Sequence, residues 1–318
     1  MRQLVAVLAA VFAASAFGQA FPTRPITMIV PYAAGGSADV VARPVAAEMG
    51  KVLGENVVVE LRPGAGGNIG AEHVARSARA DGYTILLASL SLATNVSLMK
   101  LSFDPRKDLA AIGGITTFPN VLLVSSQDPA KSLQDIVSRA REEPGKLTYG
   151  SSGPGTSSHL AGELLSVAAG IQLVHVPYKG SGAVYPDLIA RRVTLLFDLA
   201  GSASGHIKGG QVKALAMTGK RRASALPDIP TFVESGFPDF EFGAWLGLFA
   251  PSKTPKEIVG RLEEAMLRTI ETPEMKNRLS QLGGEPIPAR ATEFWKFFND
   301  DVERYARLVR DGKVKPIQ

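Results

Sequence analysis

Two polar segments of the chain have the composition of a turn that binds an anion. The first spans Ala34 to Asp39, and the second spans Ser151 to Thr156. Glycine lets the backbone approach a ligand closely, and the free N–H groups at a helix start favour a carboxylate or a phosphate. Both segments therefore predict capture of a small anion. The candidate contacts are Gly36, Ser37 and Asp39 in the first segment and Ser151, Ser152, Gly153, Gly155 and Thr156 in the second.

Each segment also has an explanation that needs no ligand. Ser37 can be an ordinary helix N-cap with Asp39 in the first turn, which stabilises the helix by itself. The second segment can be a flexible polar loop. A capped helix start still presents free N–H groups, so both roles are compatible in the first segment.

His159 lies three residues after Thr156, the expected cap of a helix. Together with Ser152 it raises the alternative of a secreted serine hydrolase. The nucleophile elbow of such enzymes is Gly-x-Ser-x-Gly, and here Pro154 stands where the last glycine belongs. No third member of a catalytic triad is evident, so we expect binding and no enzymatic activity.

Polar residues also follow two apolar stretches that we expect to be strands. Tyr178 and Lys179 come after His175-Val176-Pro177, and Asp198 comes directly after Phe197. In open α/β sheets, ligands bind outside the carboxyl ends of the strands. A solvated lysine at a strand end, or a helix N-cap at Asp198, explains the same residues without a ligand.

The composition excludes several kinds of chemistry. The chain of 318 residues has no cysteine, which excludes disulfides, thiolate nucleophiles and Cys-ligated metals. Its four histidines lie far apart and form no His-Glu-x-x-His array, so we expect no metal and no cofactor. A formal charge of +5, from 35 Lys and Arg against 30 Asp and Glu, is too small for a nucleic-acid binder.

The N-terminus has the order of a secretory signal peptide at residues 1–20. Arg2 precedes an apolar run from Leu4 to Phe17, and the small residues Gly18 to Ala20 follow. The run is shorter than the roughly 20 apolar residues that span a bilayer. We expect cleavage after Ala20 and a soluble chain that is secreted or periplasmic.

Short apolar runs alternate with helical stretches from residue 26 onward. We expect strands at 26–30, 56–60, 83–88, 120–124 and 146–149, and helices at 39–49, 69–78 and 133–141. Gly50 would end the first helix, residues 62–67 would form a tight glycine-rich connection, and the stretch before 120 would be irregular. Strands that alternate with helices predict parallel βαβ units and a doubly wound α/β fold.

The C-terminal part is expected to be mostly helical. Thr254 to Glu257 have the pattern of a capping box with proline at the first helical position. Thr292 would cap the last helix. Two apolar stripes are expected to be core, Ile258, Leu262, Met266 and Ile270 in one helix and Trp295, Phe298, Val302 and Tyr305 in the other.

Longer motifs occur along the whole chain. They are residues 31–43, Arg62-Pro63-Gly64-Ala65-Gly66-Gly67, Asp81-Gly82-Tyr83-Thr84, residues 151–156 with His159-Leu160, residues 175–180, Leu226-Pro227-Asp228-Ile229-Pro230-Thr231 and Trp245-x-Gly247-Leu248. In this order they resemble the Bug family, the periplasmic solute-binding proteins of tripartite tricarboxylate transporters. The resemblance covers essentially all of the chain after residue 20.

The resemblance implies a two-lobed, hinged fold like that of type II periplasmic binding proteins, with mixed sheets flanked by helices in each lobe. It also implies that a ligand carboxylate is held between the turn from Tyr32 to Asp39 and the turn at 151–156, with His159 beside the second. Ser89, Tyr178, Lys179 and Asp198 would line the remaining walls. An Asp198 at the far end of the ligand would favour a cationic amine.

We expect lobe 1 to comprise residues 21–123 and 243–318, and lobe 2 to comprise residues 124–242. The expected partners are a small organic acid or amino acid and the permease subunits of a tripartite transporter in a Gram-negative periplasm. A sensor protein is the alternative to the permease, and the chain is expected to be a monomer. Leu61, Val96 and Arg191-Arg192 depart from the family pattern, the last pair at a hairpin position where glycines are common.

Overall fold

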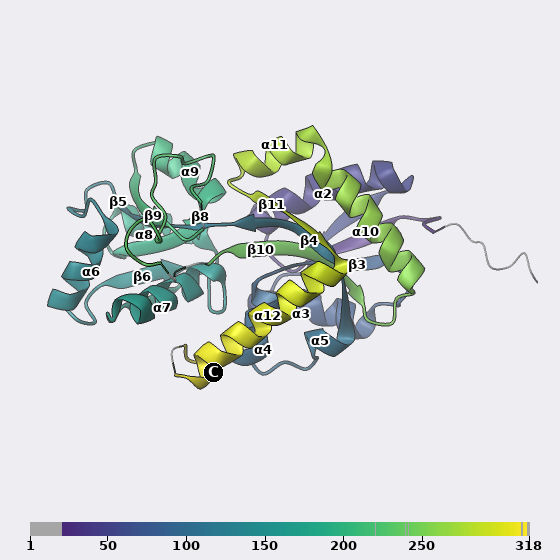
Figure 1. Cartoon of the computed structure of the whole chain (residues 1–318), viewed down its shortest axis with the longest axis horizontal. Helices are drawn as coiled ribbons and strands as arrows, with labels where there is room; N and C mark the ends of the chain where they lie inside the picture. The colour runs from purple at the N-terminus through teal and green to yellow at the C-terminus, as the bar shows by residue number, and fades with distance from the viewer. Residues whose placement is uncertain (1–20, 220, 239, 241, 313, 317–318) are drawn as a thin grey trace, which may run out of the picture.

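Two β-sheets with helices against their faces lie side by side along the long axis of the molecule (Figure 1). The computed structural model describes residues 21–219, 221–238, 240, 242–312 and 314–316, so the expected signal peptide lies outside the described residues. Within those ranges no helix combines the length and the hydropathy of a membrane span. The predicted two-lobed α/β fold with mixed sheets is confirmed.

The first sheet has six strands in the order β11-β4-β10-β3-β1-β2. β1 pairs in parallel with β2 and β3, and β10 runs antiparallel to β3 and β4. Its strands are β1 (Ile26–Val30), β2 (Val57–Leu61), β3 (Thr84–Ser89), β4 (Leu109–Phe118), β10 (Ala244–Pro251) and β11 (Glu285–Arg290). Alternate residues of β1 enter opposite cores, Met28 one and Ile29 the other, because successive side chains of a strand point to opposite faces.

The second sheet has five strands in the order β7-β6-β8-β5-β9. β6 pairs in parallel with β7 and β8, whereas β5 is antiparallel to both of its neighbours. Its strands are β5 (Asn120–Ser125), β6 (Thr148–Ser151), β7 (Val174–Pro177), β8 (Leu195–Leu199) and β9 (Val212–Met217).

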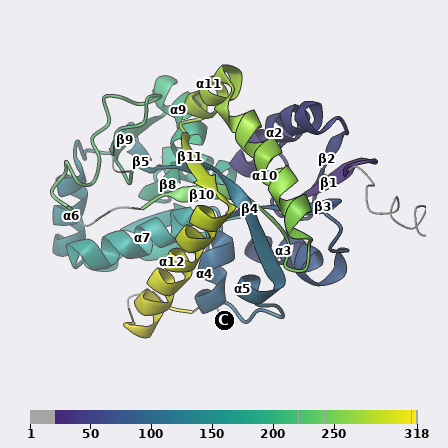
Figure 2. The same ribbon diagram turned by 45° about the vertical axis from the view of Figure 1, so that its right-hand side comes forward.

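Helices cover both faces of each sheet. Figure 2 shows α2 (Ser37–Leu53), α10 (Lys256–Glu271) and α11 (Pro273–Gln281) on one face of the first sheet. The opposite face carries α3 (Asn68–Glu72), α4 (Ser91–Leu98), α5 (Pro105–Asp108) and α12 (Ala291–Arg310). In the second lobe, α6 (Leu133–Glu142) and α7 (Ser157–Ala169) cover one face, and α8 (Tyr185–Ile189) and α9 (Ala200–Lys208) the other. Shorter turns are η2 (Ala65–Gly67), η3 (His73–Ser77) and η4 (Ser181–Ala183).

The chain crosses between the sheets at Pro119, and it returns in the segment between Thr218 and Ala244. The expected lobe boundary at 123/124 falls inside β5, all of which pairs with β8 and β9 of the second sheet. The crossing is therefore earlier than predicted. The fully buried run from Val121 to Val124 gives no sign of the boundary, whereas Pro119 cannot donate a ladder hydrogen bond and separates the two strands.

Four local predictions are wrong. Thr292 does not cap the last helix, because α12 begins at Ala291 and its N-cap residue is Arg290. α2 continues through Gly50 to Leu53 and ends at Gly54, whose φ of 78° is the left-handed conformation of a helix C-cap. Thr254 caps nothing, because α10 begins after Pro255 and no side-chain hydrogen bond caps its first turn. The stretch before Asn120 is not irregular, since it contains α4, α5 and the ten-residue strand β4.

Both predicted apolar stripes pack on the core, although Ile258 and Trp295, the first residue of each, are only half-buried. Leu262, Met266 and Ile270 of α10 are buried, as are Phe298, Val302 and Tyr305 of α12. The expected hairpin at Arg191 is not formed, because this residue lies in the connection between α8 and β8. Its φ of 60° is a left-handed conformation that favours glycine.

Candidate ligand-binding site

The first predicted turn lies between β1 and α2 at the carboxyl end of a central strand. The first intrahelical hydrogen bond of α2 runs from Val40 N to Gly36 O at 3.0 Å, so the N–H groups of residues 37–39 stand at the open end of the helix. Gly35 has a φ of 76° and donates its N–H to Asp39 Oδ2 at 2.9 Å. Asp39 also lies 2.9 Å from Arg43 Nε, so its carboxylate stabilises the turn from within the lobe.

Gly36 is exposed on the surface of this turn, whereas the side chain of Ser37 lies outside the described part of the chain. The backbone of Gly36 is extended, with a φ of −71°. A methyl group there would lie 3.4 Å from Ala33 O, which is ordinary contact. The open space above Gly36 is therefore available to a ligand, and an alanine would fill it without straining the fold.

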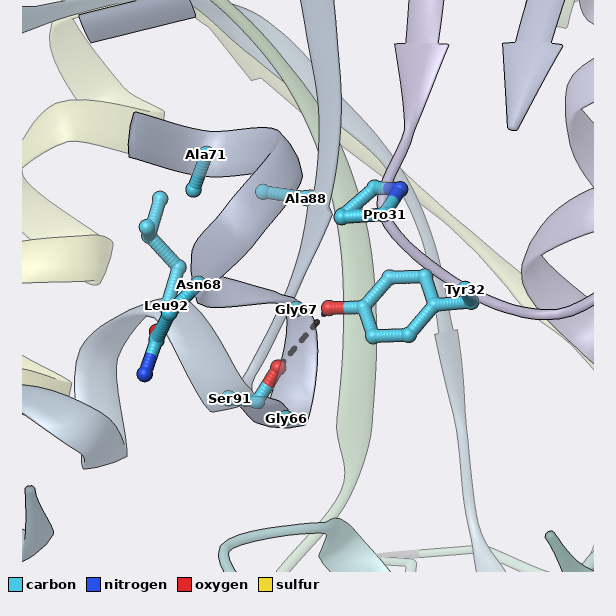
Figure 3. Close-up of a pocket in the computed structure, with 9 residues that line it drawn as sticks. All are labelled: Pro31, Tyr32, Gly66, Gly67, Asn68, Ala71, Ala88, Ser91 and Leu92. Atoms are coloured by element: carbon cyan, nitrogen blue, oxygen red, sulfur yellow. Dashed lines mark hydrogen bonds between the residues drawn. The ribbon is translucent and has the colours of Figure 1, made fainter. Parts of the chain in front are cut away.

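Tyr32 brings the first turn into contact with β3 and α4. Its hydroxyl lies 2.5 Å from Ser89 Oγ and 2.7 Å from Ser91 Oγ, and the two serine hydroxyls are 3.0 Å apart. Figure 3 shows the ring directed at Ser91 across a small pocket whose floor is the loop at Gly66 and Gly67. Burial raises the pKa of Tyr32, so the phenol stays protonated and can donate to one of the serines.

The second predicted turn lies between β6 and α7 and is closed by hydrogen bonds among its own residues. Ser152 N and Ser152 Oγ both lie 2.8 Å from Ser158 Oγ, and Thr156 Oγ1 donates to Gly153 O at 2.6 Å. Ser151 Oγ accepts from Gly153 N at 3.2 Å. The helix begins with Leu160 N bonded to Thr156 O at 3.0 Å, which leaves the N–H groups of residues 157–159 at its open end.

His159 lies in the first turn of α7, and its side chain is buried. Its Nδ1 accepts from Gly155 N at 3.2 Å, and its Nε2 lies 3.8 Å from Glu163 Oε1. Burial lowers the pKa of His159 to about 4. The serine–histidine pair of the hydrolase alternative is not formed, because Ser152 is hydrogen-bonded to Ser158 and the histidine is bonded to Gly155.

The two turns meet through residues that the sequence did not assign to the site. Thr94 Oγ1, on α4 of lobe 1, donates to Gly155 O of the second turn at 3.1 Å. A Cβ atom on Gly66 would lie 3.7 Å from Pro154 O, and one on Gly67 would lie 3.2 Å from the Tyr32 hydroxyl. The glycine-rich loop at 62–67, which we expected to be only a tight connection, therefore lies between the two turns and packs closely against both.

Asn95 anchors this loop from α4. Its Nδ2 donates to Gly66 O at 3.3 Å and to Asn68 Oδ1 at 3.0 Å. The available signals in the sequence were the dense glycines at 64–67 and the Ser89-x-Ser91 pair at a strand end. α4 was missed altogether, and with it Thr94 and Asn95.

The remaining predicted wall residues lie at the same end of the second sheet. Tyr178 N donates to Ser151 O at 3.1 Å, but the Tyr178 side chain turns to α8, where its hydroxyl donates to Asp187 Oδ2 at 2.7 Å. Burial, and then the bond to Asp187, raises the pKa of Tyr178 to about 12. Lys179 next to it is exposed.

Asp198 lies at the end of β8, two residues beyond the Gly150–Leu196 pair of the β6–β8 ladder. It is buried, and it accepts from Tyr185 OH at 2.8 Å and from Leu199 N at 2.9 Å. Burial raises the pKa of Asp198 to about 6, although these donors oppose the shift. The carboxylate therefore links α8 to β8 and already has a partner on each oxygen.

Asp198→Asn is expected to change how stability depends on pH. The pKa of this carboxyl rises from 3.8 to about 6 on folding, so the wild type loses stability relative to the variant as the pH rises from 4 to 6. The relative loss should be about 3 kcal/mol, at about 1.4 kcal/mol for each unit of pKa shift. Urea unfolding of both proteins at pH 4, 5, 6 and 7 measures it, with Asp311→Asn at an exposed carboxylate as the control. A difference that stays constant over this range would contradict the prediction.

Another hollow lies elsewhere, between α7 and the C-terminal half of α12. Its volume is about 650 Å³, and apolar side chains such as Leu164, Phe237 and Leu308 line it with Arg304. None of the predicted site residues contributes to it. The candidate site is thus the junction of the two turns and not this groove. In the described residues no group of three or more His, Asp or Glu side chains is placed to hold a metal ion.

Two α/β lobes joined by crossing strands, with a glycine-rich helix start from each lobe at the junction, define the class of the periplasmic binding proteins. The model of the tripartite tricarboxylate transporter family receptor matches residues 41–313. The chain belongs to this family and is a solute-binding protein. The resemblance to the Bug proteins is confirmed.

Solved structures of similar proteins agree over nearly the whole chain. The periplasmic binding protein BugD is 36% identical, with a TM-score of 0.85 over 93% of this chain and 100% of BugD. The structure of Rpa4515 from R. palustris with adipate is 31% identical, with a TM-score of 0.87 over 93% of this chain and all of that one. MatC from Rhodopseudomonas palustris with bound malate is 33% identical, with a TM-score of 0.82 over 91% of this chain and 100% of MatC.

Proposed function

We propose that the protein captures a small organic acid between the turns at 32–39 and 151–156 and delivers it to the permease subunits of a tripartite transporter in the periplasm. The observation that carries the proposal is the pair of helix starts at the junction of the lobes. The N–H groups of residues 37–39 and 157–159 lead α2 and α7, and the bond from Thr94 to Gly155 brings the second turn against lobe 1. Aligned N–H groups and hydroxyls favour a carboxylate.

A plain dicarboxylic acid is the first candidate ligand. The structures of MatC and Rpa4515 contain malate and adipate, and both acids carry two carboxylates. An amino acid is the weaker candidate, because each oxygen of Asp198 already accepts a hydrogen bond from within the second lobe.

A thermal-shift screen of the chain from Phe21, stripped of bound ligand, tests the proposal. The panel contains malate, succinate, adipate, citrate, aspartate and glutamate. An acid at 100 times its dissociation constant should stabilise the protein by roughly 2.7 kcal/mol, which raises the melting temperature by a few degrees. Gly36→Ala should leave the unliganded protein stable and abolish the shift, because the methyl group fills the space above the first turn.

Gly260→Ala is the matched control, since a Cβ atom at that position of α10 meets nothing within 4 Å. It should keep the full ligand-induced shift. The proposed function fails if no acid shifts the wild type. The placement of the site fails if Gly36→Ala responds to the acid as the wild type does.

A further inference from the structure

Two histidine rings are stacked beneath the second turn. His159 of α7 and His175 of β7 have ring centroids 4.2 Å apart, and Tyr149 of β6 stacks on His175 at 4.9 Å. Each histidine contacts one residue of the turn. His159 Nδ1 bonds to Gly155 N at 3.2 Å, and His175 Nε2 lies 2.6 Å from Ser151 Oγ.

The bond to Gly155 determines the protonation state of His159. A backbone N–H can only donate, so Nδ1 must be an unprotonated acceptor and the proton of the neutral ring is on Nε2. That N–H faces Glu163 Oε1 at 3.8 Å, and Tyr149 OH donates to the same oxygen at 2.6 Å. An imidazolium would direct an N–H at the N–H of Gly155 and would break the bond.

Gly155 also carries one of the hydrogen bonds between the lobes; another joins Ser224 and Ser280. The Gly155 carbonyl accepts from Thr94 Oγ1 of lobe 1 at 3.1 Å, and both residues are buried. The φ of Gly155 is 74°, a left-handed conformation that glycine adopts without steric cost. Because glycine can take other conformations as readily, its hydrogen bonds help to determine which one it keeps. His159 accepts the hydrogen bond from the N–H of Gly155, and Thr94 donates one to its carbonyl.

We propose that His159 is a positioning residue that does not touch the ligand. It fixes Gly155 so that the carbonyl takes the hydrogen bond from Thr94 when the lobes meet around the ligand. The inference rests on the proposed function. It adds that His159, through Gly155, controls the hydrogen bond between the second turn and Thr94 of lobe 1. The titratable groups that face His159 are His175 and Tyr149 from the sheet and Glu163 from its own helix.

The test compares His159→Asn, His159→Leu, Thr94→Val and the double variant His159→Leu/Thr94→Val by the affinity of the acid found in the screen. Asparagine keeps an acceptor near the position of Nδ1, so His159→Asn should bind within about threefold of the wild type. His159→Leu and Thr94→Val should each bind about tenfold more weakly, as expected for the loss of one buried hydrogen bond. The double variant should be no weaker than the weaker single variant, because both changes release the same residue. His73→Leu on η3 is the control and should bind as the wild type does.

The pH dependence of the acid affinity distinguishes the positioning role of His159 from a purely structural one. Burial lowers the pKa of His159 to about 4, so wild-type affinity should fall as the pH approaches 4 from above, while His159→Asn has no ring to protonate. The ratio of the two affinities isolates this effect, because the carboxyl groups of the acid titrate identically for both proteins. This comparison does not depend on whether His159→Leu folds.

Three results would overturn the proposal: wild-type affinity for His159→Leu, equal losses for His159→Asn and His159→Leu, or additive losses in the double variant. Hydrogen exchange at the Gly155 amide without ligand separates this failure from that of the proposed function. If no acid binds the wild type, faster exchange in His159→Leu than in His159→Asn still supports the positioning role. Equal exchange in the two variants overturns it.

Discussion

Gly201→Ala is expected to destabilise the protein by about 3 kcal/mol, at the upper end of the cost of overpacking a core. A Cβ atom on Gly201 would lie 1.8 Å from Leu282 O, and this oxygen belongs to backbone that cannot rotate away. Gly201 is in the first turn of α9 in lobe 2, and Leu282 lies between α11 and β11 of lobe 1. The clash is therefore between the lobes, and relief requires that they move apart.

Urea unfolding and acid affinity measure the two parts of this prediction. Ligand affinity should fall by about tenfold, because part of the binding free energy is spent on restoring the lobe contact. Gly205→Ala on the same helix is the control, since its Cβ meets nothing within 4 Å and alanine stabilises a helix relative to glycine by up to about 1 kcal/mol. Wild-type stability and affinity in Gly201→Ala would show that the lobes do not pack as described.

Trp245→Ala is expected to destabilise the protein by about 3–5 kcal/mol, the usual cost of deleting a buried aromatic ring. Trp245 of β10 is fully buried, and the rings of Phe294 and Phe298 from α12 meet it at 5.2 and 6.2 Å. Its Nε1 donates to Asp301 Oδ2 at 2.8 Å. The substitution thus opens a cavity and leaves a buried carboxylate without its indole donor.

Trp245→Phe separates these two effects. It keeps an aromatic ring but removes the donor, and an unsatisfied buried acceptor costs about 1–3 kcal/mol. Burial already raises the pKa of Asp301, and the indole N–H opposes that shift. Without the indole donor the ionised carboxylate costs more to bury, so Trp245→Phe should lose more stability at pH 7 than at pH 5. Chemical unfolding at both pH values tests this. The half-buried Trp295 provides the control, because Trp295→Ala should cost much less; an equal cost for the two alanine variants would contradict the prediction.

The sequence predicted the strands and helices where the signal is local. β1 and α6 lie within a residue of their expected ranges, because a short apolar run and a capped amphipathic stretch each specify their conformation over a few residues. α4 and β4 were missed, since both are almost wholly buried and their apolar residues show no clear periodicity. The sequence does not distinguish Gly50 from a helix C-cap, because a glycine can stand inside a helix as well as at its end. The helix continues to its C-cap at Gly54.

By itself the sequence determined the two turns at 32–39 and 151–156, because a strand end, glycines and a helix start follow one another within ten residues. The tertiary structure decided what surrounds them. Thr94 reaches Gly155 across 61 residues of sequence, and His175 meets Ser151 across 24. Only the folded structure showed that His159 faces inward to Gly155 and that Asp198 is committed to Tyr185. Such contacts depend on how sheets and lobes pack, and no spacing along the chain specifies the direction of a buried side chain.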